Sequence, residues 1–187
     1  MQIYLIRHGQ TDWNKKFLIQ GISDKLLNDT GKEQAKEIVH FFDEVQPTKL
    51  ISSPLSRAKE TLSIIKTQQK WDLKIVENPS FLERDFGELE GKEVTAYTEA
   101  TDLSKYQGFE HNKQIEQRVS QGIEEIVNKS KNDEVVVITC HAHTMKSFLV
   151  NYFPQTYTYQ YKLKNCAIIK VDIPDNKLDK IKLEIVN

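Results

Sequence analysis

Cysteine, glycine and proline are all scarce in this sequence, which has two cysteines, seven glycines and five prolines in 187 residues. Two cysteines cannot build a disulfide framework, and so little glycine and proline argues against a disordered or fibrous chain. The chain opens with no charged leader and apolar segment, and no apolar run reaches the about 20 residues of a membrane span. We therefore expect a folded protein of the reducing cytoplasm that has no membrane partner.

An excess of charge of either sign is also missing, because the sequence has 26 Lys and Arg residues and 27 Asp and Glu residues. Nucleic-acid binding usually requires a broad basic field, so we expect no nucleic-acid partner. Any selectivity for anions must then be local. The length and the 39% hydrophobic fraction suit one domain over residues 1–187, present as a monomer or a homodimer.

Helical and strand patterns alternate along the chain. Thr30 and Glu33 match a capping box, and Ser53 followed by Pro54 is typical of a helix start. Residues 135–139 are β-branched and apolar on both faces, which indicates a central parallel strand. The patterns predict helices at 30–45, 54–69, 113–129 and 141–151, and strands at 1–6, 49–52, 73–77, 135–139, 157–162, 167–172 and 180–186, with an irregular segment over 78–108. Such alternation predicts an α/β fold.

Cationic and imidazole side chains follow the predicted strands. Arg7 and His8 come after the first strand, Arg57 begins a helix after the second, and His141 follows the central strand. Ligands of α/β sheets bind outside the carboxyl ends of the strands, and arginine forks match phosphate oxygens. The pattern therefore predicts a phosphate site. Taken singly, His8 could be a structural histidine and Arg57 a surface residue paired with a glutamate.

Six segments in order resemble the histidine phosphatase superfamily, which includes the cofactor-dependent phosphoglycerate mutases and many small phosphatases. The resemblance runs from residue 1 to about 168 and is carried by Arg7-His8-Gly9-Gln10-Thr11 with Asn14, Gln20-Gly21, Ser53-Pro54-Leu55-Ser56-Arg57, Leu82-Glu83-Arg84-Asp85-Phe86-Gly87, His141, and Asn165-Cys166-Ala167-Ile168. It implies a three-layer α/β/α sandwich with a mainly parallel central sheet, as in phosphoglycerate mutase.

The resemblance also implies roles for individual residues. His8 would be the nucleophile that forms a phosphohistidine, and Glu83 the general acid and base, a role that calls for a raised pKa. Arg7, Arg57 and His141 would hold the phosphoryl oxygens. Further phosphate contacts are expected from Asn14, Gln20, Gly21 and Ala142. The implied activity is hydrolysis of a small phosphomonoester, with no metal and no cofactor.

The sequence departs from the family pattern in a few places. Ala142 stands where the family usually has glycine, so its Cβ is expected to crowd the pocket and to weaken activity. Cys140 replaces a common serine and Lys146 a common arginine. His111 occupies the serine position of a Gly-Glu-Ser element, which puts one phosphate contact in doubt.

Two other chemistries fit parts of the sequence less well. The segment from Cys140 to Lys146 differs by one substitution from the loop of thiol phosphatases, in which a cysteine and an arginine are separated by five residues. Lys146 replaces that arginine, and lysine lacks the planar fork that caps a phosphate. His141 and His143 look like a metal pair, but alternate residues at a helix start do not share a face. The family resemblance is therefore the preferred interpretation.

Two other functions within the family remain open. A mutase must hold the distal phosphate of its intermediate, yet residues 92–107 offer only Lys92 and Lys105 and no arginine, which favours hydrolysis over the mutase alternative. A non-catalytic phospholigand-binding or regulatory module is disfavoured because His8 and Glu83 are retained. The sequence does not identify the substrate.

Overall fold

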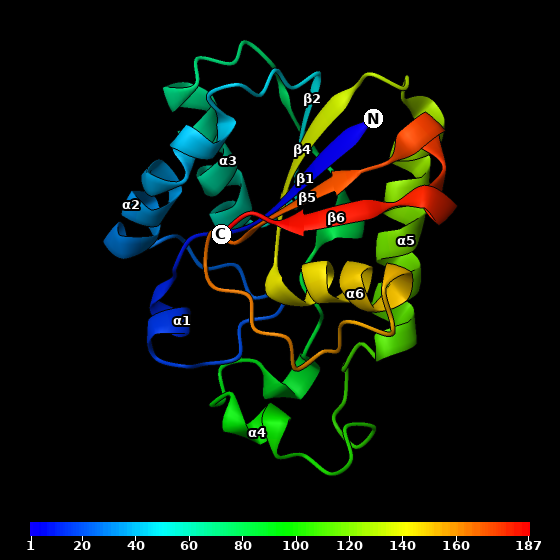
Figure 1. The fold of residues 1–187 in the computed structure, drawn as a ribbon. Helices are drawn as coiled ribbons and strands as arrows, with labels where there is room; N and C mark the ends of the chain where they lie inside the picture. The colour runs from blue at the N-terminus through cyan, green and yellow to red at the C-terminus, as the bar shows by residue number, and fades with distance from the viewer.

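The computed structural model describes residues 1–187. Its centre is one mixed sheet of six strands in the order β3-β2-β4-β1-β5-β6 (Figure 1). The strands are β1 (Gln2–Arg7), β2 (Lys49–Ser52), β3 (Ile75–Glu77), β4 (Val135–Cys140), β5 (Ile168–Asp172) and β6 (Lys182–Ile185). The first four run parallel, whereas β5 and β6 pair antiparallel at one side of the sheet. The predicted mainly parallel α/β sheet is confirmed, with β4 in its interior.

Helices cover both faces of the sheet because the side chains of its strands alternate between two cores. Ile3 and Leu5 of β1 belong to a core under α5 (Asn112–Lys129) and α6 (Ala142–Tyr152). Tyr4 and Ile6 belong to a second core under α2 (Asp29–Glu37) and α3 (Ser56–Gln68). The result is the three-layer α/β/α sandwich, with the two helix pairs on opposite sides of the sheet in Figure 1.

The long connection between β3 and α5 contains only short helical turns and projects beyond the carboxyl ends of the parallel strands (Figure 1). It includes α4 (Thr95–Thr98) and 3-10 turns at Pro79–Phe81 and Gly87–Leu89. Its small core is built on Ile19, Phe86, Leu89 and Phe109. A second short helix, α1 (Asp12–Lys15), follows β1 at the same end of the sheet.

Two helix starts differ from the prediction. The capping box at Thr30 does not form, because Asn28 is the N-cap of α2 and its side chain accepts the N–H of Gly31 at 2.9 Å. This helix ends at Glu37, and a 3-10 turn at Val39–Phe42 continues the chain. Likewise α3 begins at Ser56 rather than at Pro54, after the extended residue Leu55.

The predicted strand at 157–162 is wrong, because these residues are irregular apart from a turn at 159–160. Their aromatic side chains pack against helices instead: Tyr159 stacks on His143 at 6.1 Å between ring centroids and contacts Ser147 Oγ at 3.1 Å. Tyr157 and Tyr161 pack against the core under α5 and α6. None of the helices combines the length and apolar composition that a membrane crossing needs.

Candidate active site

Three parallel strands deliver the predicted site residues to one edge of the sheet. Arg7, the last residue of β1, lies opposite Cys140, the last residue of β4. His8 and His141 follow these two ends, and their ring centroids are 5.1 Å apart. Ser53 follows the end of β2 on the other side of β4. The parallel register therefore brings together residues that are separated by more than a hundred positions in the chain.

His8 is buried, and its hydrogen bonds define which ring nitrogen carries the proton. Its Nδ1 lies 2.6 Å from the carbonyl oxygen of Gly9, and Arg57 Nε donates to its Nε2 at 3.2 Å. The carbonyl can only accept, so Nδ1 carries the proton and the lone pair is on Nε2. Burial, with help from Arg57 and Arg7, lowers the pKa of His8 well below 6.5. His8 is therefore a neutral imidazole at neutral pH, and its Nε2 lone pair accepts a hydrogen bond from Arg57.

Arg57 lies in the first turn of α3 and is fully buried, so it is not the surface residue that the alternative interpretation allowed. Its guanidinium donates to the carbonyl oxygens of Gly21 at 2.7 Å and Ser23 at 3.0 Å. With its amide turned so that the nitrogen donates to Thr11 Oγ1, Gln20 adds a third contact, in which its amide oxygen accepts from a terminal nitrogen of Arg57 at 2.9 Å. Burial lowers the pKa of Arg57 to about 10, which leaves it cationic at neutral pH.

His141 has one ring nitrogen paired and one free. Its Nε2 lies 2.8 Å from Ser53 Oγ, while its Nδ1 is buried without a partner. Ser53 Oγ also accepts the N–H of Leu55 at 3.3 Å, which fixes the hydroxyl beside His141. Burial, together with Arg57 and His8, lowers the pKa of His141 and keeps the ring neutral.

Arg7 and Asn14 complete this side of the site. Arg7 donates through one terminal nitrogen to the carbonyl oxygen of Leu163, and its buried Nε has no partner. Asn14 Oδ1 accepts from the side chain of Asn165, which also donates to the carbonyl oxygen of His8 at 3.1 Å. Asn165 thus links the loop after β1 to the segment before β5. The Nε of Arg7 remains available as a hydrogen-bond donor beside His8.

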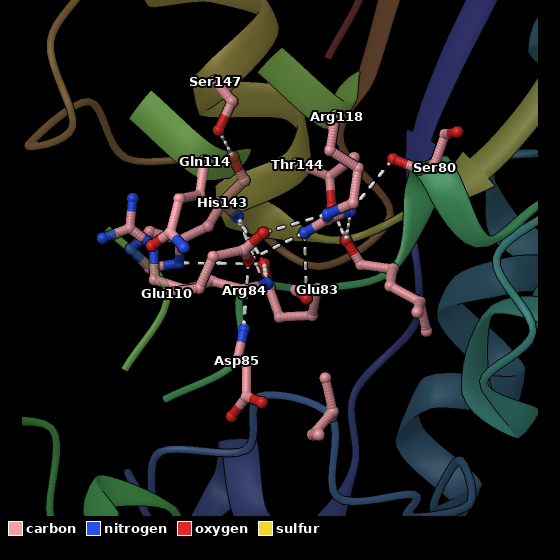
Figure 2. Close-up of polar contacts among 12 residues, drawn as sticks. Ser80, Glu83, Arg84, Asp85, Glu110, Gln114, Arg118, His143, Thr144 and Ser147 are labelled. Atoms are coloured by element: carbon pink, nitrogen blue, oxygen red, sulfur yellow. Dashed lines mark hydrogen bonds and ion pairs between the residues drawn. The ribbon is translucent and has the colours of Figure 1, made fainter. Parts of the chain in front are cut away.

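Glu83 reaches the same edge from the connection between β3 and α5, and its carboxylate meets the N-terminus of α6 (Figure 2). Its Oε1 accepts from the backbone N–H of Arg84 at 2.9 Å and of His143 at 3.0 Å. Its Oε2 has only a long contact of 3.4 Å to the same His143 N–H. The negative charge of Glu83 raises the pKa of both Arg7 and Arg57 against the lowering by burial. One oxygen is therefore fixed and the other is the freer atom.

Comparison with known proteins identifies the family of this chain. The sequence profile of the histidine phosphatase superfamily (branch 1) matches residues 3–185, almost the whole chain. The chain belongs to this superfamily. The predicted family and the predicted fold are confirmed, and the chain is a histidine phosphatase, a phosphoric monoester hydrolase.

Individual relatives support the same family. The chain is 33% identical over 147 residues to the uncharacterized phosphatase PhoE of Bacillus subtilis, which covers 79% of this chain and 75% of that protein. It is 32% identical over 190 residues to a metal-independent phosphoserine phosphatase of Arabidopsis thaliana, covering 94% and 78%. A phosphoglycerate mutase structure from Bacillus anthracis shares the fold with a TM-score of 0.86 at 19% identity, covering 100% and 92%.

Three further residues of this histidine phosphatase that the sequence singled out have the following surroundings. His111 is exposed and precedes α5, where its backbone N–H donates to Gln114 Oε1 at 2.8 Å, so its side chain is not among the residues around His8. Gly21 takes part through its carbonyl oxygen, which holds Arg57. Ala142 is half-buried as the first residue of α6.

His141 and His143 have different surroundings despite their spacing. His143 lies among aromatic rings, 5.1 Å from Phe86 and 5.6 Å from Tyr97 between centroids, whereas His141 contacts Ser53. Burial, Arg84 and Lys146 lower the pKa of His143. The two histidines therefore do not form the metal pair considered above.

The thiol of Cys140 is a core group of the phosphatase. It is fully buried in the core under α5 and α6, and burial followed by the charge of Glu83 raises its pKa. A nucleophilic thiol needs the opposite shift. The geometry therefore disfavours the thiol phosphatase alternative.

Two residues near the site were not among the predicted site residues. Arg84 is fully buried, donates to Asn112 Oδ1 at 2.8 Å and lies over the ring of Tyr159 at 4.8 Å. Gly31 touches the loop after β1, since a Cβ there would lie 2.1 Å from the carbonyl oxygen of Gln10. These contacts depend on segments that only the folded chain brings together.

Proposed function

We propose that this protein hydrolyses a small phosphomonoester through a phosphohistidine formed on Nε2 of His8. The observation that carries the proposal is the state of that imidazole: neutral, with its Nδ1 proton fixed on Gly9 and its Nε2 lone pair held beside the guanidinium of Arg57. A neutral ring nitrogen next to fixed cations suits attack on a phosphoryl group.

In the first step, His8 Nε2 forms a bond to phosphorus while the bond between phosphorus and the ester oxygen breaks. The carboxyl of Glu83 gives its proton to the leaving oxygen, so that an alcohol departs. We assign this proton to Oε2, because Oε1 is already held by two backbone N–H groups. Arg7 and Arg57 offset the charge on the phosphoryl oxygens, and we assign to His141, whose buried Nδ1 has no partner in the protein, a hydrogen bond to one of them.

In the second step, water attacks the phosphorus of the phosphohistidine. The carboxylate of Glu83 takes a proton from that water, the nitrogen–phosphorus bond breaks, and inorganic phosphate leaves with the neutral ring of His8 restored. Throughout, the hydrogen bond from His8 Nδ1 to Gly9 supports the positive charge that the phosphorylated ring carries. The step consumes one water and needs no metal or cofactor.

The proposed substrate is a small molecule, acted on in the cytoplasm. A cleft of about 470 Å³ opens beside Glu83 and offers room for a modest leaving group. It is lined in part by Ile22, Asp85, Phe109 and Gln114. One relative is named for phosphoserine, a small phosphomonoester of this size class.

Hydrolysis is favoured over transfer to a second hydroxyl, as a mutase requires. Lys92 and Lys105 are both exposed and lie over the ring of Tyr106, at 5.6 and 5.2 Å from its centroid. Residues 92–107 thus contribute no enclosed cation for a distal phosphate. The acceptor hydroxyl would have to compete with water without being held in place.

The test is the variant His8→Ala. It should abolish turnover of p-nitrophenyl phosphate and the acid-labile labelling of the protein by substrate phosphate, whereas the exposed variant His40→Gln should keep both. Circular dichroism would verify that both variants are folded. Retention of more than about a tenth of the activity by His8→Ala would refute the covalent mechanism.

A further inference from the structure

Glu83 sits in a stretch of backbone that has no helix or strand to hold it. Residues 82–85 belong to no regular element, between a 3-10 turn that ends at Phe81 and a bridge at Phe86. The proposed acid must nevertheless stay fixed to a fraction of an ångström to transfer a proton efficiently. Something other than secondary structure therefore sets the position of Glu83.

The guanidinium of Arg118, on α5, reaches this stretch and donates to its carbonyl oxygens (Figure 2). One terminal nitrogen donates to the carbonyl oxygens of Ser80 and Leu82, both at 3.0 Å, and the other contacts the carbonyl oxygen of Glu83 at 3.4 Å. These bonds run from a well-packed helix to the irregular segment, since Ile115 and Val119 on either side of Arg118 are buried in the core.

Glu110 fixes Arg118 and holds the other side of the same stretch. It accepts from Arg118 Nε at 3.0 Å and from a terminal nitrogen at 2.8 Å, a bidentate pair of limited exposure. The same carboxylate accepts the backbone N–H of Asp85 at 3.3 Å, and its own backbone N–H donates to the carbonyl oxygen of Asp85 at 2.8 Å. The main chain is thus held immediately before and immediately after Glu83.

We propose that the Arg118–Glu110 pair is a positioning device that holds the carboxyl of Glu83 at the oxygen of the leaving group. Both residues border the cleft beside Glu83, but their hydrogen bonds run to each other and to the main chain around Glu83, so we assign them a role that passes through Glu83. This inference rests on the proposed function, in which Glu83 protonates the leaving alcohol. It predicts a selective loss: reactions that need a proton on the leaving group suffer, and reactions that do not need one are largely spared.

Two substrates of similar shape separate these cases. Benzyl phosphate leaves as an alkoxide and needs the proton, whereas p-nitrophenyl phosphate leaves as a stable phenolate. The value of kcat/KM reports the steps up to formation of the phosphohistidine, so the ratio of kcat/KM for the two substrates measures general acid assistance. Arg118→Met should lower kcat/KM for benzyl phosphate roughly 10- to 100-fold, part of the full contribution of a general acid, and that for p-nitrophenyl phosphate only a few-fold.

Conservative and double variants show whether the effect passes through Glu83. Arg118→Lys keeps the charge but not the fork, so it should lower the ratio partly, and Glu110→Gln should do the same. In a Glu83→Gln background, Arg118→Met should lower the ratio no further, because the acid is already gone. Glu134→Gln is the matched control: it breaks a partly buried ion pair with Lys49 at the opposite end of β4 and should leave the ratio unchanged.

The outcomes are distinct. Equal losses for both substrates in folded Arg118→Met, or a further loss in the Glu83→Gln background, would show a merely structural role and overturn the inference. If Arg118→Met does not fold, an unchanged ratio in Glu110→Gln overturns it as well. A wild-type protein that hydrolyses neither substrate would refute the proposed function instead.

Discussion

Acidification should destabilise the folded protein through three buried histidines, His8, His141 and His143. Burial is the largest cause that lowers the pKa of each ring well below 6.5, and nearby cations lower it further. Below a pH of about 6.5, these imidazoles are therefore protonated in the unfolded chain but stay neutral in the folded chain. Stability is fully present above a pH of about 6.5 and is lost as the pH falls below that value, because protons then favour the unfolded state.

The size of the effect follows from proton linkage. At pH 5.5, about one unit below the ordinary pKa of histidine, keeping one ring neutral costs about 1.4 kcal/mol. Three rings together cost about 4 kcal/mol, a large share of the about 5–15 kcal/mol that stabilises a typical domain. For a chain of this length the melting temperature should fall by roughly 10 °C between pH 7.5 and 5.5.

Urea unfolding at a series of pH values between 7.5 and 5.5 measures this dependence directly. The free energy of unfolding should fall with a limiting slope of about three protons, and His143→Gln should reduce that slope by about one proton. His40→Gln, which removes an exposed histidine, should leave the slope as it is in the wild type. A slope below one proton in the wild type would refute the view that these rings stay neutral in the folded state.

Three further predictions test the site from other sides. Cys140→Ser should keep most of the activity towards p-nitrophenyl phosphate, since the buried thiol has a raised pKa and takes no part; a loss as deep as that of His8→Ala would revive thiol chemistry. Gly31→Ala should destabilise the protein by about 1–3 kcal/mol in urea unfolding, because its Cβ would lie 2.1 Å from the carbonyl oxygen of Gln10; unchanged stability would mean that this contact yields freely. With phosphoglycerate and catalytic bisphosphoglycerate, inorganic phosphate should appear faster than the isomers interconvert, and rapid interconversion with little free phosphate would indicate a mutase.

The sheet and the residues at its edge were predictable because both follow from short-range patterns. The apolar run at 135–139 is the interior strand β4, since only a strand covered on both faces needs apolar side chains on both. His8 and His141 follow parallel neighbours, so their meeting needed no more than the assumption of parallel strands. The family motifs then supplied Glu83, which no pattern of periodicity marks.

Local signals failed where several residues compete for one position. Thr30 and Asn28 are both good N-caps, and Asn28 caps α2 because its side chain reaches the N–H of Gly31 while Gly31 packs against the loop after β1. The extended pattern at 157–162 failed because the sheet has no place for it: its tyrosines are taken up by His143 and the core. In both cases a tertiary contact decided between local alternatives.

The irregular backbone around Glu83 explains why its supports could not be predicted. Arg118 and Glu110 are eight residues apart in the sequence, which is not a helical neighbour spacing. Apart from its pair with Glu110, Arg118 donates to carbonyl oxygens, which every residue possesses. No residue type at positions 80–83 encodes that contact. When a side chain binds the main chain of a distant loop, the sequence reveals only that side chain and not its partners. Here it shows only an arginine on the half-buried side of an amphipathic helix. For this reason the groups that touch phosphate are recognisable in the sequence, whereas the groups that hold them in place emerge only from the folded structure.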